Sequence, residues 1–273
     1  MRKQIFSKFT TLFVVLLLAV SVTALADDMN TDDTMPMMGM LTDAGYIDVT
    51  PDEALQLIRE TSDLVIIDVS PKYDEGHLPG ALHYYIGDGS LDAAIPMLDS
   101  TKTYLVYCHV DAASIPGATK LVEAGFDTVY RLKGNFGAWV EAGLPVSTLT
   151  MEEEVLLNEA AMTGMRTEAG FIDISPQQVN ALIEAIPALA IIDVSPLYND
   201  GHLPGAMHYF VGDGTLDEAI PMLDRNKPYV VYCHTDEAST MGASKLIEAG
   251  FWPVFRLEGN FPAWADAGLP IAK

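Results

Sequence analysis

The sequence contains few cysteines and few basic residues. It has 2 cysteines, one in each half, so neither half can close a disulfide of its own. It has 15 lysines and arginines against 38 aspartates and glutamates, which gives a net charge of -23 at pH 7. Such an acidic surface repels phosphate backbones and anionic lipid head groups. We therefore expect neither nucleic acid nor a membrane surface among the partners of the mature protein.

Apolar residues are plentiful by contrast. They make up 49% of the 273 residues, while charged residues make up 19%. A chain of this length and composition is long enough to bury the cores of two ordinary domains.

The N-terminal segment has the pattern of a secretory signal. Three basic residues precede an apolar run at 12–22, and Ala24-Leu25-Ala26 supplies a small-x-small cleavage site. The pattern predicts that residues 1–26 are a signal peptide and that the mature protein is exported to the periplasm, the cell surface or the medium. The alternative is an uncleaved membrane anchor. Cleavage would take the net charge from -23 to -26, because the removed segment has three basic residues and no acidic ones.

The remainder of the chain is organised by an internal repeat. Residues 39–148 match residues 164–273 without a gap, and about three positions in five are identical. Each copy is large enough for a core of its own, so the repeat predicts two domains of one fold. Residues 27–38 are acidic and rich in methionine and are predicted to be a disordered leader, while residues 149–163 are predicted to be a helical linker.

Within each copy, short apolar runs alternate with helical patterns. Leu64-Val-Ile-Ile-Asp-Val69 is typical of a strand covered on both faces. Thr50-Pro-Asp-Glu53 and its copy Ser175-Pro-Gln-Gln178 have the residues of a helix-capping box. Strands alternating with helices predict an α/β fold, in which each copy forms a mainly parallel sheet with helices on both faces.

The two cysteines are the strongest candidates for chemistry. Cys108 and Cys233 each follow an apolar strand and open a predicted six-residue loop, which ends at Ser114 or Ser239 before a helix. Backbone N–H groups at a helix start stabilise an anion such as a thiolate. Two alternatives stay open at this point. Each cysteine could be a small buried apolar residue, or the two could form a disulfide between the copies.

The sequence resembles the rhodanese family of sulfurtransferases over nearly all of both copies. The resemblance is carried by three segments in order, which are the aromatic-x3-His-Leu-Pro-Gly-Ala signature, the cysteine with its following helix, and a closing Gly-Asn-Phe-x-Ala-Trp segment. They lie at 73–81, 108–125 and 132–145 in the first copy and at 198–206, 233–250 and 257–270 in the second. The resemblance implies a rhodanese-like fold in each copy, with Cys108 and Cys233 as sulfur carriers. It implies no metal or cofactor, and its partners would be a small sulfur donor and a nucleophilic acceptor or thiol protein.

The cysteine segments depart from the family pattern in their charge. The family commonly places glycine three residues and a basic residue five residues after the cysteine, and an arginine after the preceding Asp-Val. This sequence has acidic or small residues there: Asp111, Ala113 and Ser70, and in the second copy Asp236, Ala238 and Ser195. The missing arginine argues against phosphatase chemistry. We therefore expect weak turnover of thiosulfate and a preference for neutral or cationic donors.

The acidic residue at Asp111, and Asp236 in the second copy, would oppose formation of the thiolate. A carboxylate about 7 Å away costs a thiolate roughly 2.4 kcal/mol at an effective dielectric of about 20. A helix start offers roughly 0.3 to 1 kcal/mol, so these carboxylates are expected to cancel it unless loop N–H groups surround the sulfur.

Four further residues are candidates to assist the thiols. His109 and His234 follow the cysteines and could lower the thiol pKa when protonated or shuttle a proton, with an exposed loop histidine as the alternative. Asp68 and Asp193 lie at strand ends, where a bond to loop backbone competes with a role at the active site.

Three functions fit the sequence. The preferred one is an exported sulfurtransferase that carries sulfane sulfur as a cysteine persulfide in each domain. The others are a non-catalytic binding module of the same fold and a thiol-disulfide partner in the cell envelope.

Overall fold

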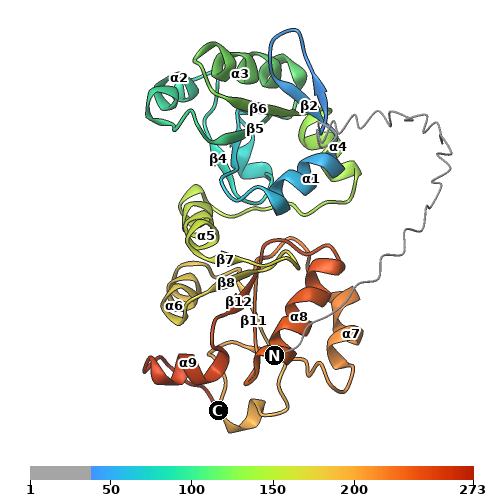
Figure 1. Cartoon of the computed structure of the whole chain (residues 1–273), viewed down its shortest axis with the longest axis vertical. Helices are drawn as coiled ribbons and strands as arrows, with labels where there is room; N and C mark the ends of the chain where they lie inside the picture. The colour runs from blue at the N-terminus through green and yellow to red at the C-terminus, as the bar shows by residue number, and fades with distance from the viewer. Residues whose placement is uncertain (1–37) are drawn as a thin grey trace, which may run out of the picture. The chain divides into compact units, whose positions relative to one another are not determined.

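The structure is a computed structural model that describes residues 38–273 (Figure 1). The predicted signal peptide, residues 1–26, and nearly all of the predicted leader lie outside the described residues. None of the helices within 38–273 combines the length and the apolar character needed to cross a membrane.

The first repeat folds around a six-stranded sheet. All neighbouring strands pair in parallel except the first, which is antiparallel to the second. The strand order is β1-β2-β6-β5-β3-β4. In chain order these strands are β1 Met40–Leu41, β2 Ile47–Val49, β3 Val65–Asp68, β4 Ala81–His83, β5 Thr103–Tyr107 and β6 Thr128–Leu132.

The second repeat has a sheet of the same topology. Its order, β10-β9-β11-β12-β8-β7, is that of the first sheet read from the other edge. The strands are β7 Met165–Arg166, β8 Ile172–Ile174, β9 Ala190–Asp193, β10 Met207–His208, β11 Tyr229–Tyr232 and β12 Val254–Leu257. The predicted α/β fold with mainly parallel sheets is confirmed. The edge strands were missed because two or three residues are too few to show a period.

Helices connect the strands in the order that the sequence predicted. Thr50 caps the first helix through the expected box, because its backbone N–H donates to Glu53 Oε2 at 2.7 Å. The helices are α1 Pro51–Glu60, α2 Ser90–Ala94, α3 Asp111–Glu123 and α4 Asn135–Glu141, then α5 Met151–Thr163, and then α6 Pro176–Ala185, α7 Thr215–Ala219, α8 Asp236–Glu248 and α9 Asn260–Asp266.

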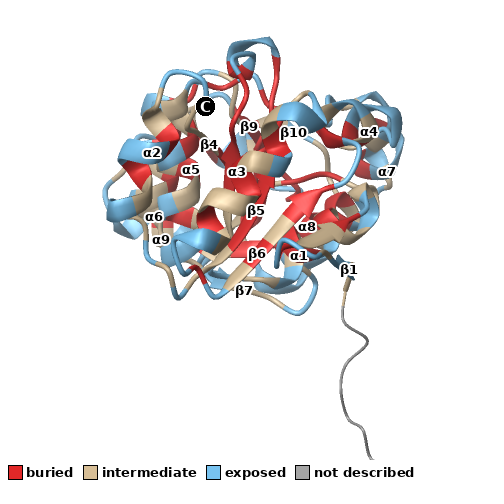
Figure 2. Cartoon of the chain, turned by 90° about the horizontal axis from the view of Figure 1, so that it is seen from above, coloured by how far each residue is buried: buried red, intermediate tan, exposed pale blue. Residues whose placement is uncertain are grey.

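The central strands form the cores. All four residues of β9 and of β11 are buried, as are the last four of β5. Figure 2 shows this burial along the strands and the exposed outer faces of the helices. Strands buried on both faces read as continuous apolar runs, which explains why the sequence revealed these strands so clearly.

A buried carboxylate on helix α5 binds the turn at residues 77–80 of the first repeat. Glu154 is fully buried, with Oε1 3.1 Å from His77 Nε2, and Oε2 accepts the backbone N–H of Gly80 at 2.8 Å. Asn158 Nδ2 donates to the Gly80 carbonyl at 2.9 Å. A Cβ on Gly80 would lie 3.0 Å from Asn158 Oδ1, and the φ of +84° already favours glycine. In the second repeat, no described carboxylate pairs with His202.

We predict that Glu154→Ala lowers the free energy of unfolding by about 3 to 5 kcal/mol, because it leaves the His77 ring and the Gly80 N–H buried without their partner. Urea denaturation measures the change. Glu159→Ala, on the exposed face of the same helix, is the control and should change stability by less than about 0.5 kcal/mol. Equal effects of the two substitutions would show that the buried carboxylate of Glu154 does not stabilise the fold.

Candidate active site

Each cysteine lies between the end of a central strand and the start of a helix. Cys108 follows β5 and Cys233 follows β11, and both are free thiols with 1% and 2% exposure. The predicted six-residue loops are wrong in extent, because α3 begins at Asp111 and α8 at Asp236. An aspartate in the first turn suits the positive end of a helix, which favours this early start. The loop proper is therefore only three residues long.

The backbone of each cysteine is held by an asparagine from the following strand–helix turn. Asn135 Oδ1 accepts the Cys108 N–H at 3.2 Å, and the Phe136 N–H donates to the Cys108 carbonyl at 2.9 Å. Asn260 holds Cys233 in the same way at 3.1 Å. Both asparagines have a φ of 59°, a left-handed conformation that asparagine tolerates better than most residues.

The sulfur of Cys108 lies in a buried setting with opposing influences. Burial raises the pKa of the Cys108 thiol and is the largest effect, and the negative charge of Asp68 adds to it. The backbone N–H groups of Val110 and His109 lower the pKa in part. These are the loop N–H groups that the sequence argument required, although burial outweighs them.

A buried arginine neutralises the acidic residue of the cysteine segment. Arg131, on β6, makes a bidentate pair with Asp48 on β2, at 2.7 and 2.9 Å. Its Nη1 donates to Asp111 Oδ1 at 2.6 Å and to Ser114 Oγ at 3.3 Å. Asn135 Nδ2 donates to the same Asp111 oxygen at 2.7 Å. One guanidinium thus joins two strands to the start of α3.

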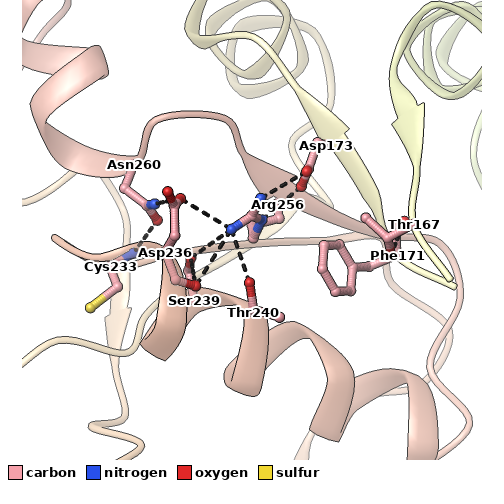
Figure 3. Close-up of polar contacts among 9 residues, drawn as sticks. All are labelled: Thr167, Phe171, Asp173, Cys233, Asp236, Ser239, Thr240, Arg256 and Asn260. Carbon is pink, nitrogen blue, oxygen red and sulfur yellow. Dashed lines mark hydrogen bonds and ion pairs between the residues drawn. The ribbon is translucent and has the colours of Figure 1, made fainter. Parts of the chain in front are cut away.

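The second repeat contains the same network (Figure 3). Arg256, on β12, pairs with both oxygens of Asp173 at 2.7 Å and lies 3.2 Å from Asp236 Oδ1. It also donates to Ser239 Oγ at 3.3 Å and Thr240 Oγ1 at 3.0 Å. The site therefore recurs with its charge balance intact.

This network corrects the expected effect of Asp111 on the thiol. An ion-paired carboxylate with a second hydrogen bond exerts much less net repulsion than a free one, so Asp111 does not simply cancel the helix start. Arg131 and Arg256 were missed by the sequence argument. One signal could have revealed them, because each is a lone arginine within an apolar strand and each has a partner aspartate in the first parallel strand of its repeat.

The strand-end aspartates are buried beside the cysteine segments. Asp68 Oδ1 accepts the Ser70 N–H at 2.8 Å, and Asp193 Oδ1 accepts the Ser195 N–H at 2.8 Å. In each carboxylate, Oδ2 has no hydrogen-bond partner among the described residues. Burial raises the pKa of Asp68. These residues support the loop backbone, and the free oxygen of Asp68 acts on the Cys108 thiol through its charge.

The histidines after the cysteines lie against phenylalanine rings, stacked in the first repeat and tilted in the second. The ring centroids of His109 and Phe136 are 4.5 Å apart, and those of His234 and Phe261 are 4.6 Å apart. Burial lowers the pKa of His109 and so disfavours a positive charge on its ring. This burial works against the expected assistance of the thiolate by a protonated His109.

The two thiols differ in one polar side chain nearby. Thr235 Oγ1 lies 3.9 Å from Cys233 Sγ, within reach of a hydrogen bond to sulfur. The equivalent residue in the first repeat is Val110, which offers no such group. The two sites therefore share the asparagine contact to the cysteine backbone and differ in one polar contact at the sulfur.

The described residues contain no group of three or more histidine, cysteine, aspartate or glutamate side chains arranged to hold a metal ion. What the site does offer is a buried thiol on a backbone that an asparagine holds in place. The serines at the family's arginine position, Ser70 and Ser195, are fully buried, and their hydroxyls accept backbone N–H groups of the next turn. Neither supplies an anion-binding group to the site.

Comparison with known proteins identifies the family of each repeat. The model of the rhodanese-like domain matches residues 50–142 and 175–267. The chain is similar to thiosulfate sulfurtransferase GlpE of Actinobacillus pleuropneumoniae serotype 5b, with 32% identity over 104 residues, which are 38% of this chain and 94% of that protein. It is also similar to GlpE of Coxiella burnetii strain RSA 331, with 36% identity over 96 residues, 34% of this chain and 87% of that protein.

Two solved structures match parts of this chain. The crystal structure of the Alr3790 protein from Anabaena sp. matches with 32% identity and a TM-score of 0.34, covering 36% of this chain and 79% of that chain. The thiosulfate sulfurtransferase from Pseudomonas aeruginosa matches with 21% identity and a TM-score of 0.34, covering 82% of this chain and 43% of that chain.

Because burial raises the pKa of Cys108, we expect its alkylation by iodoacetamide to reach half its limiting rate above pH 8.5, roughly the ordinary thiol pKa. Asp111→Asn should move this midpoint downward by about 0.5 to 1 unit, since it removes a negative charge and leaves Arg131 less neutralised. Peptide-resolved mass spectrometry over a pH series measures both. Asp236→Asn is the control that should leave the Cys108 profile unchanged. An unchanged or higher midpoint in Asp111→Asn would show that the charge of Asp111 does not raise the pKa of the Cys108 thiol.

The polar contact at Cys233 can be tested by exchanging two residues. Val110→Thr should speed alkylation of Cys108 at pH 7.5 about 2- to 5-fold, since a hydroxyl donor stabilises the thiolate by roughly 0.5 to 1 kcal/mol. Thr235→Val should slow alkylation of Cys233 by a similar factor. In each variant the other cysteine serves as the internal reference. If neither exchange changes the alkylation rate, the hydroxyl makes no bond to the sulfur.

Proposed function

Because this chain belongs to the rhodanese-like domain family, we propose that it is a sulfurtransferase that carries sulfane sulfur as a persulfide on Cys108 and Cys233. The observation that supports this most directly is the setting of the thiol. Asn135 Oδ1 accepts the Cys108 N–H and holds the cysteine backbone, and the backbone N–H groups of Val110 and His109 favour the thiolate. A persulfide anion built on that sulfur would need such donors in a site that excludes bulk water.

The proposed reaction has two displacements at sulfur. The Cys108 thiolate attacks the sulfane sulfur of the donor, a sulfur–sulfur bond forms, and the donor's former partner leaves with the electron pair. An acceptor nucleophile then attacks the outer sulfur of the persulfide, and the bond to Sγ breaks to restore the thiolate. Neither step changes the overall electron count, so no external oxidant or reductant is needed.

The charge around the thiol affects which sulfur donors the site can accept. The curated relatives described above are thiosulfate sulfurtransferases. In this chain the arginine beside the cysteine segment is committed to two carboxylates, and Ser70 occupies the usual arginine position. A dianionic donor such as thiosulfate would therefore find no unpaired arginine at Arg131. We propose that donors are neutral or cationic, and that thiosulfate is turned over weakly.

A non-catalytic binding module is the second candidate, and the burial of both cysteines favours it. At 1% and 2% exposure the thiols are barely accessible, and the raised pKa of Cys108 reduces its reactivity at neutral pH. Replacing both cysteines with serine separates the two functions. A binding module keeps its biological function in that variant, whereas a persulfide carrier loses it.

We further propose that the protein is exported after cleavage near Ala26 and that its partners are a small sulfur donor and a nucleophilic acceptor or thiol protein. The support is the basic, apolar and small-residue pattern of residues 1–26. N-terminal sequencing of the protein recovered from cell fractions tests the cleavage. A thiol-disulfide partner function would instead produce a mixed disulfide at one of the two cysteines under mild oxidation.

We predict a mass increase of about 32 Da on Cys108 and Cys233 after treatment with sulfane donors, as expected for a persulfide. The single variants Cys108→Ser and Cys233→Ser should each lose the adduct at one site and keep it at the other. A polysulfide, an organic persulfide and thiosulfate should be compared, with thiosulfate giving the lowest occupancy. Absence of the adduct with all three donors in the folded protein would contradict the proposal.

A further inference from the structure

A cavity of about 370 Å³ lies away from both cysteine sites, within the compact unit formed by residues 37–273. Its walls come from five parts of the chain: the end of α1 with the following β3 segment, residues 79–82 at the start of β4, helix α5, Arg166 on β7, and residues 252–255 at the start of β12. Glu154, Glu159, Ala161 and Trp252 are among the lining residues. The volume falls within the range of roughly 300–1,000 Å³ that is usual for small-molecule sites.

Most of the cavity wall is apolar. Ile66, Leu82, Leu157 and Phe255 contribute side chains to it. Glu154 also lines it, but both of its carboxylate oxygens already have partners, as described above. Such a cavity would accept an apolar body of moderate size.

One cationic side chain on the wall has unused hydrogen-bonding capacity. Arg166 donates through Nη1 to the carbonyl oxygens of Ile58, at 2.8 Å, and Arg59. Its guanidinium carbon lies 5.2 Å from the centre of the Trp252 ring. Its Nε is buried and has no hydrogen-bond partner among the described residues. A buried N–H donor without a partner is costly, and no described carboxylate balances the charge that Arg166 brings to the cavity wall.

A second arginine adds to the positive charge at this end of α1. Arg59 does not line the cavity, but its Nε and Nη2 are buried without partners in the described part of the chain. Neither Arg59 nor Arg166 pairs with a carboxylate among residues 38–273. Burial lowers the pKa of both groups. In a chain with a net charge of -23, two neighbouring arginines without counter-ions are unusual.

The residues that give the cavity its polarity are not shared between the repeats. The positions equivalent to Arg166 and Trp252 hold Leu41 and Asp127 in the first repeat, and Arg59 corresponds to Glu184 in the second. The polar lining of the cavity is therefore not repeated between the two copies, unlike the cysteine site.

We propose that this cavity binds a small amphiphilic anion, with a carboxylate or sulfonate head at Arg166 and an unbranched or ring-shaped apolar body against the apolar wall. The guanidinium presents its N–H groups in a plane, which suits an anionic oxygen acceptor. Glu154 and the exposed Glu159 also line the cavity, and their like charge weakens such binding. This inference does not depend on persulfide chemistry.

The test uses the full chain and three ten-carbon probes that differ only in head group: decanoate, decanol and decyltrimethylammonium. Titration calorimetry and Trp fluorescence measure binding below the aggregation threshold of each probe. We expect decanoate to bind one per chain and at least about 10-fold more tightly than decanol, because a charge-assisted hydrogen bond is lost in the alcohol. The cationic probe should not bind saturably. Equal affinities for the three, or no saturable binding of decanoate, would overturn the proposal.

Three variants locate the binding. Ala161→Phe fills the cavity and should weaken decanoate binding at least about 10-fold, and Arg166→Gln should reduce decanoate to the affinity of decanol. Glu159→Gln, at an exposed position, should tighten decanoate binding about 2- to 5-fold. Circular dichroism confirms folding in each case. Undiminished binding in a folded Ala161→Phe variant would place the probe elsewhere and refute the assignment.

Discussion

The pairing of one buried arginine with two aspartates supports the rest of each cysteine site. A guanidinium out of water is tolerated only where carboxylates surround it, and Arg131 finds one on β2 and one at the start of α3. The same Asp111 oxygen accepts the Asn135 side chain, whose carbonyl holds the Cys108 backbone. The position of the sulfur therefore depends on a chain of contacts that begins at an ion pair two strands away.

The two repeats keep this scaffold and differ around it. In the first repeat, Glu154 ties the His77 turn to α5, whereas the second has no such carboxylate among the described residues. At the sulfur, the second repeat has Thr235 where the first has Val110. Both repeats thus hold the cysteine backbone through an asparagine, and they differ at the histidine turn and beside the sulfur.

The sequence predicted the fold well for physical reasons that are local. Strands buried on both faces leave unbroken apolar runs, and helix caps such as Thr50 have a fixed spacing. The prediction was less good where a contact crosses between elements. Asp111 was placed in a loop and treated as a free charge, because neither its helix nor the partner Arg131, 20 residues away, can be inferred from neighbouring residues. The lowered pKa of His109 likewise follows from partial burial that arises only in the folded chain.

What the sequence determined by itself was the duplication, the α/β class, the family resemblance and the location of one thiol after a central strand in each repeat. These follow from periodicity and from motifs whose residues are close together in the chain. Only the tertiary structure decided the charge balance at the thiol, the asparagine that holds the cysteine backbone and the cavity lined by Arg166. Each of these depends on distance in space between residues that are far apart in sequence, and electrostatic energy and burial respond to that distance alone.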